Sequence, residues 1–136
     1  MKIVIAALAT SALLAASPAL KAETAVERGE KRLARMLGER VAGPRVQCFT
    51  VKEGTNAIAI DGVAVVYDQG DVMYVGRPVN AIDPRDMIMG PERGGRWRTA
   101  ASPICATQTF HTVSRLPGQS AGHADIREFV PYRRMG

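Results

Sequence analysis

The hydropathy pattern separates the first 22 residues from the rest of the chain. A basic start precedes an unbroken apolar run over residues 3–16, and small residues continue to Ala22 before the charged Glu23. This order is typical of a secretory signal peptide, and the apolar core of roughly 14 residues is shorter than the ~20 that a bilayer-spanning helix needs. We therefore expect residues 1–22 to be a signal peptide cleaved after Ala22, with Ala19 as the alternative site.

The next stretch, residues 24–42, has the periodicity of one amphipathic helix. Thr24 and Glu27 have the spacing of a capping box. Gly29 weakens the helix by about 1 kcal/mol relative to alanine, and Gly43-Pro44 is expected to end it. The charged face is either solvated or docked on an anionic membrane surface. The apolar face carries Val26, Leu33, Met36, Leu37 and Val41.

From residue 45 onward the pattern changes to strands, the first being Val46–Val51. Two apolar runs, 57–60 and 63–67, flank Asp61-Gly62, a pair that favours a two-residue type I′ turn because both central residues need positive φ. Such a turn places Ile60 opposite Val63. The bulky residues would then share one face, namely Ile58, Ile60, Val63, Val65 and Tyr67. The alanines of the other face, Ala57, Ala59 and Ala64, either lie under the helix or face solvent.

A second turn at residues 68–71 leads into another strand, and a four-residue loop there would place Tyr67 opposite Val72. Beyond this meander, residues 79–103 are rich in Pro, Gly and Arg and are expected to form a loop, apart from one helical turn begun at 83–86. Strand character returns at 104–113. The last predicted strand, Ile126–Val130, is expected to stop at Pro131. The predicted fold is α+β: an N-terminal amphipathic helix packed on an antiparallel sheet of about five strands, in one domain over residues 23–136.

Charge and cysteine content refine this picture. The full chain has a net charge of +5, and loss of Lys2 and Lys21 with the signal peptide leaves a small positive excess. Such an excess favours weak contact with anionic surfaces, while export excludes nucleic acid as the expected partner. In an exported protein, Cys48 and Cys105 are expected to form a disulfide. Redox catalysis normally needs a Cys-x-x-Cys turn, which this chain lacks.

Catalytic chemistry has little support in the sequence. His111 and His123 lack the short ligand spacings typical of zinc sites, and Asp83 with Asp86 is better explained as the cap of a turn. We therefore expect no catalytic residue, no metal and no cofactor. The alternative is a thiol-disulfide or small hydrolytic enzyme that uses Cys48 and Cys105 or His111. Inhibition of a host lysozyme is disfavoured, because two positively charged proteins repel each other.

One unusual patch is the segment Arg93-Gly94-Gly95-Arg96-Trp97-Arg98. Arginine binds phosphate through a bidentate fork, and Trp suits an interface. This segment predicts an anion-binding site made by Arg93, Arg96, Trp97 and Arg98. The competing interpretation is a solvated loop whose Trp packs on the core.

Several short elements together resemble a family of small exported proteobacterial proteins with a domain of unknown function. They are Cys48-Phe49, the tyrosines Tyr67 and Tyr74, Ile104-Cys105 where the family has Leu-Cys, and a closing Phe129-Val130-Pro131. The resemblance implies a β-rich periplasmic domain with paired cysteines and no catalytic residue. The expected function is thus a non-enzymatic binding or structural module of the cell envelope, with an unidentified envelope component or protein as its partner.

Overall fold

The computed structural model describes residues 22–90, 96–98, 102–114 and 122–135, with the backbone alone at 96–98. The expected signal peptide therefore lies outside the described residues, except for its last position. The helix is α1, Ala25–Leu37. The strands are β1 Val41–Ala42, β2 Cys48–Val51, β3 Asn56–Ile60, β4 Ala64–Asp68, β5 Val72–Pro78, β6 Met87–Met89, β7 Arg96–Arg98, β8 Ser102–Cys105, β9 Phe110–Val113, β10 Gly122–Ala124 and β11 Ile126–Arg133.

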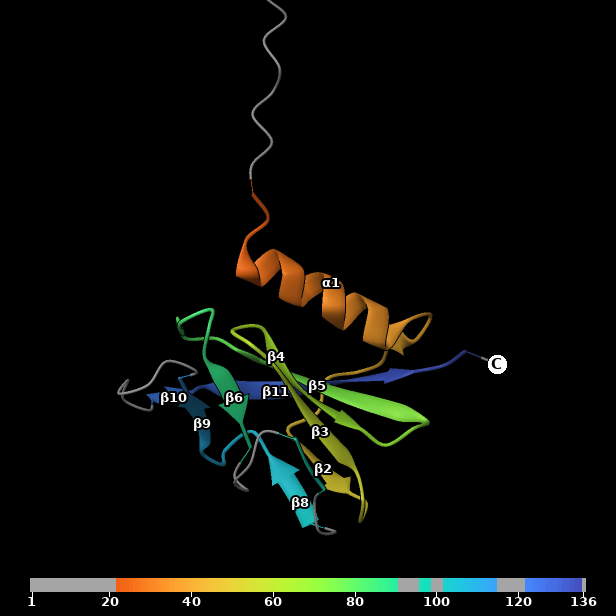
Figure 1. Cartoon of the computed structure of the whole chain (residues 1–136). Helices are drawn as coiled ribbons and strands as arrows, with labels where there is room; N and C mark the ends of the chain where they lie inside the picture. The colour runs from red at the N-terminus through yellow and green to blue at the C-terminus, as the bar shows by residue number, and fades with distance from the viewer. Residues whose placement is uncertain (1–21, 91–95, 99–101, 115–121, 136) are drawn as a thin grey trace, which may run out of the picture.

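A six-stranded sheet of order β1-β11-β5-β4-β3-β7 forms the middle layer. α1 lies across one face of it (Figure 1). A three-stranded sheet, β10-β9-β6, and a two-stranded sheet, β2-β8, cover the other face. Every strand pair within the described residues is antiparallel. The α+β class and the β3-β4-β5 meander are confirmed, and the main sheet has six strands where about five were expected.

The helix begins as predicted and ends earlier. The Thr24 hydroxyl accepts the N–H of Glu27 at 3.1 Å, which is half of the predicted capping box. The end predicted at residue 42 is wrong, because α1 stops at Leu37 and Gly38 takes a positive φ of 57°. The freed segment then forms β1, where Val41 pairs with Arg133 of β11. Sheet pairing therefore replaces the last predicted turn of helix.

The predicted register of the β3–β4 hairpin is wrong by one residue. Ile60 pairs with Ala64, so Asp61, Gly62 and Val63 form a three-residue loop. Gly62 has a φ of 67° while Asp61 does not enter the positive-φ region. Positive φ at the second central position alone is typical of a type II turn, whereas type I′ requires it at both. The N–H of Val63 closes the turn on the carbonyl of Ile60 at 2.9 Å.

A shift of one residue moves side chains to opposite faces of a sheet, so the predicted single bulky face is divided between the two. Ile60, Ala64 and Val66 pack with Leu33 of α1, which is 2% exposed. Val65 and Tyr67 face the smaller sheets together with Ala57. Of the three alanines considered for the helix side, only Ala64 lies there. Both faces of the main sheet are apolar, because α1 covers one face and the two smaller sheets cover the other.

The second turn is tighter than predicted. Tyr67 pairs with Tyr74, not with Val72, and the N–H of Gln69 donates to the carbonyl of Val72 at 3.0 Å. The connection is therefore the two-residue turn Gly70-Asp71. Gly70 alone of this pair has a positive φ, 86°, as in a type II′ hairpin. The register moves by two residues, so Tyr67 keeps its predicted face.

The C-terminal half departs from the prediction in four places. Residues 83–86 form a hydrogen-bonded turn before β6 where a helical turn was expected, and Arg96–Arg98 pair with β3 as β7. The 104–113 segment is two strands, β8 and β9, joined by a turn. β11 continues through Pro131 to Arg133. Pro131 is tolerated because its carbonyl accepts the N–H of Gly43, so its missing N–H lies on the side of β1, where that short ladder ends.

The predicted disulfide is present. Cys48 and Cys105 lie directly opposite each other in β2 and β8, with Cα atoms 4.1 Å apart, and close a loop spanning 57 positions. Beside the bridge, Phe49 anchors β2 to the main sheet. Its ring stacks on Tyr74 at a centroid distance of 4.0 Å and meets Phe129 edge-on at 4.9 Å. The covalent bridge and this aromatic cluster together hold the two-stranded sheet in place.

Candidate functional site: an arginine-lined flank of α1

A hollow of about 410 Å³ lies between the first turns of α1, the β3–β4 turn and the segment before β6. Gly29 lets the helix come close to the sheet here, because a Cβ at this position would lie 2.6 Å from Cγ2 of Val63. The glycine that weakens the helix therefore has a packing role. Apolar groups and charged side chains share the wall, which consists of Ala25, Arg28, Gly29, Arg32, Ile60, Asp61, Pro84 and Arg85.

The arginines of this hollow continue along the helix. Arg28, Arg32 and Arg35 are spaced i, i+4 and i+7, which places them on one side of α1. We call this side the arginine flank. The Arg28 guanidinium donates to the backbone carbonyl of Glu23 at 2.8 Å. Within the described residues, the arginines that form no ion pair are Arg28, Arg32, Arg35, Arg40, Arg133 and Arg134.

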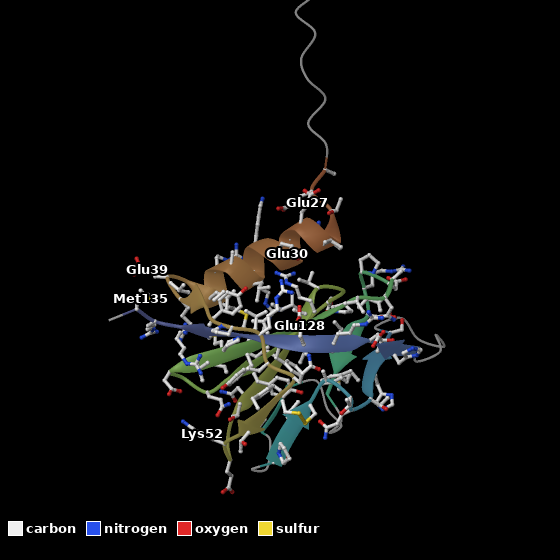
Figure 2. All side chains as sticks on the ribbon, turned by 180° about the vertical axis from the view of Figure 1, so that it is seen from behind. Glu27, Glu30, Glu39, Lys52, Glu128 and Met135 are labelled. Carbon is white, nitrogen blue, oxygen red and sulfur yellow. A yellow bond between two sulfur atoms is a disulfide. The ribbon has the colours of Figure 1, made fainter. Side chains whose placement is uncertain are left out.

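On the opposite side of α1, one carboxylate ties the helix to the sheet. Glu30 accepts two hydrogen bonds from Arg77 of β5, one of them at 3.1 Å. This contact raises the pKa of the Arg77 guanidinium. Seen from behind, Glu30 lies below the helix axis and faces the sheet (Figure 2). The Glu30 carboxylate is therefore neutralised, whereas the arginines of the flank form no ion pair with any described residue.

A second hollow, of about 520 Å³, lies at the C-terminal end of α1. Its wall includes Arg35, the last residue of the arginine flank, together with Arg40 and Arg134. Glu39 and the exposed Met135 also border it, and Figure 2 shows these two side by side. The arginine flank thus runs from one hollow to the other. The first hollow adds Arg85, and the second adds Arg40 and Arg134.

Arg85, on the rim of the first hollow, differs from the flank because it has a partner. Its guanidinium pairs with Asp83 at 2.9 Å, and the Asp83 carboxylate also accepts the backbone N–H of Arg85. These hydrogen bonds lower the pKa of Asp83 to about 2 from its ordinary value of 3.8. Asp83 therefore caps its turn, as the sequence predicts.

The anion-binding site predicted in the Arg-Gly segment does not belong to the arginine flank of α1. The backbone of Arg96–Arg98 forms β7 at the edge of the main sheet next to β3. Arg93 lies outside the described residues, and so do the side chains of Arg96, Trp97 and Arg98. That site stays a prediction.

The remaining candidate residues are distributed over separate sheets. Cys48 and Cys105 are bonded to each other in the two-stranded sheet. His111 and His123 are exposed in the three-stranded sheet, in β9 and β10. No group of three or more His, Cys, Asp or Glu side chains within the described ranges is arranged to hold a metal ion. No described helix is long and apolar enough to cross a membrane.

No family model, curated protein or solved structure matches this chain. The interpretation of the site therefore depends on its own geometry. The sequence indicated a charged helix face, but it did not show that three arginines lie on one side of α1 and Glu30 on the other. The spacing of Arg28, Arg32 and Arg35 was the available signal. The sequence did not show that Arg77 of β5 lies next to α1 and neutralises Glu30.

Proposed function

We propose that this chain is an exported, non-enzymatic binding module that docks on the anionic lipid headgroups of the cell envelope through the arginine flank of α1. The observation that carries the proposal is the row of Arg28, Arg32 and Arg35 without ion-pair partners, leading at each end into an arginine-lined hollow. A guanidinium binds phosphate oxygens in a bidentate geometry. The exposed Met135 beside the second hollow supplies an apolar contact at the same surface.

The expected strength follows from the charges. A basic residue close to an anionic membrane surface contributes about 1 kcal/mol, so the three arginines of the flank contribute about 3 kcal/mol. Every 1.4 kcal/mol corresponds to about tenfold in affinity, and loss of the flank should therefore weaken binding about a hundredfold. Binding should also fall steeply with salt, because the Debye length shrinks from about 10 Å at 0.1 M to about 3 Å at 1 M ionic strength.

The test compares three variants on vesicles of neutral phosphatidylcholine with or without anionic phosphatidylglycerol. The first replaces Arg28, Arg32 and Arg35 by Ser. The matched control removes the same number of charges elsewhere: R45S, K52S and R127S. Arg45 and Arg127 pair with Glu128 and Asp125, and Lys52 lies at the end of the molecule remote from α1 (Figure 2). The third variant, R93S with R96S and R98S, addresses the predicted site in the Arg-Gly segment.

The expected result is salt-sensitive binding to anionic vesicles that the control keeps and the flank variant loses. Equal loss in the flank variant and the control would mean that net charge alone drives association. Loss confined to the third variant would place the site in the Arg-Gly segment. Binding to an anionic polysaccharide without binding to vesicles would refute the lipid assignment.

Export has its own test. Protein recovered from the periplasm of an expressing bacterium, with thiols alkylated at lysis, should have the mass of residues 23–136 less two hydrogens and carry no alkyl group. Retention of residues 1–22 would contradict the signal peptide. Alkylation of Cys48 and Cys105 would contradict the disulfide in the exported protein and favour thiol chemistry instead.

A further inference from the structure

The β9–β10 hairpin places two histidines directly opposite each other. His123 pairs with His111 in the register of this ladder, and both side chains are exposed. Cross-strand partners project from the same face of a sheet. The two imidazoles therefore come from one face of the three-stranded sheet. Neither histidine belongs to the arginine flank or to the disulfide, so a ligand bound by this pair is independent of the proposed function.

The hydrogen bonds of His123 and Asp125 show that this is the narrow type of cross-strand pair. The side-chain amide of Asn80 donates to the carbonyl of His123 at 3.0 Å. Two residues later, Asp125 donates its N–H to the Asn80 side chain at 2.7 Å, and its carbonyl accepts the N–H of Val79 at 2.9 Å. The backbone groups of His123 thus point away from β9. Facing residues without mutual backbone bonds have Cα atoms about 4.5 Å apart, closer than hydrogen-bonded pairs.

A third donor lies in the same row. Met89 of β6 pairs with His111 from the other side of β9, so Met89, His111 and His123 occupy one line across the three strands. The alternate residues of these strands, such as Ile88 and Phe110, belong to the core on the opposite face. Met89 itself is 8% exposed, which places its thioether at the buried end of the row and the imidazoles at the solvated end.

We propose that His111 and His123 together bind one Cu²⁺ ion. A neutral imidazole offers one nitrogen lone pair to a metal, and two imidazoles on facing Cβ atoms about 4.5–5.5 Å apart are close enough to chelate a single ion. Among first-row divalent ions, affinity for a given nitrogen site peaks at Cu²⁺. Two histidines leave further coordination positions to water and to the Met89 thioether, a sulfur that serves copper as a weak, long axial ligand in blue-copper sites. This is an open site, unlike a closed structural zinc site with four protein ligands.

The experiment measures Cu²⁺ affinity of the full chain at pH 7.5 by competition with a chelator of known affinity, for the wild type, H111A, H123A and the double variant. The expected result is one competing site per chain whose affinity falls at least tenfold in either single variant. The double variant should lose little more, because either change already destroys the chelate. Two independent weak sites with additive losses would overturn the proposal.

A matched variant distinguishes chelation by two facing histidines from binding that depends only on the number of exposed histidines. H123A combined with K52H keeps two exposed histidines, since Lys52 is exposed, but places the second one outside the three-stranded sheet. It should bind Cu²⁺ as weakly as H123A alone. Wild-type affinity in this variant would show that the facing geometry is irrelevant and would refute the site. Circular dichroism should be identical for all variants, because both histidines lie at exposed positions.

Discussion

The substitution Gly62→Ala should lower the free energy of unfolding by about 3 kcal/mol, because a methyl group at this turn meets two separate penalties. Gly62 has a φ of 67°, and the left-handed region costs an L residue about 1–2 kcal/mol. The added Cβ would also lie 2.5 Å from the Cα of Pro84 and 2.9 Å from its carbonyl oxygen. These are backbone atoms, so relief requires the segment before β6 to move.

That movement has a cost of its own. The N–H of Gly62 donates to the carbonyl of Asp86 at 2.8 Å, and a lost hydrogen bond of this kind costs about 0.5–1.5 kcal/mol. Pro84 and Arg85 also form part of the wall of the first hollow. Gly62→Ala should therefore widen the hollow while it destabilises the fold.

Two other glycines provide matched controls for Gly62→Ala. Gly54 and Gly70 have φ values of 81° and 86°, and a Cβ at either position would meet nothing within 4 Å. Alanine there should cost the conformational penalty alone, about 1–2 kcal/mol. Urea unfolding followed by circular dichroism gives the three values, with unchanged m-values expected. Equal losses at all three positions would refute the steric argument and show that Pro84 moves aside freely.

Two further predictions concern the disulfide and the Asp83 turn. The double variant C48S and C105S should lose about 4 kcal/mol in denaturant unfolding, because the bridge closes a loop spanning 57 positions in the unfolded chain, and a loss below about 1 kcal/mol would contradict this. The hydrogen bonds from Arg85 lower the pKa of Asp83 from 3.8 to about 2. The ionised Asp83 carboxylate therefore makes a small contribution to stability that is fully present above pH 3.8. That contribution is lost as the pH falls through about 2. The stability difference between wild type and D83N at low salt should therefore shrink between pH 5 and pH 1.5, and a difference that grows with acid would contradict the assignment.

The sequence by itself determined those elements that depend on interactions between residues close together in the chain. The Thr24 cap, the β3-β4-β5 meander and the antiparallel class follow from hydrogen bonding and hydrophobic alternation within a few residues. The disulfide was also predictable, because the chain has just two cysteines. For the site, the sequence supplied the arginine spacing of α1 and the identity of the histidines.

Tertiary contacts decided the remainder. The helix ends at Gly38 because residues 41–42 gain pairing with β11, and the first turn takes three residues because Gly62 docks against Pro84 and Asp86. Segments far apart in the sequence supply these partners. The same holds for the two proposed sites: Arg77 neutralises Glu30 of α1, and the ladder register brings His111 opposite His123. A sequence pattern reports the periodicity of one segment, whereas a site depends on which segments meet.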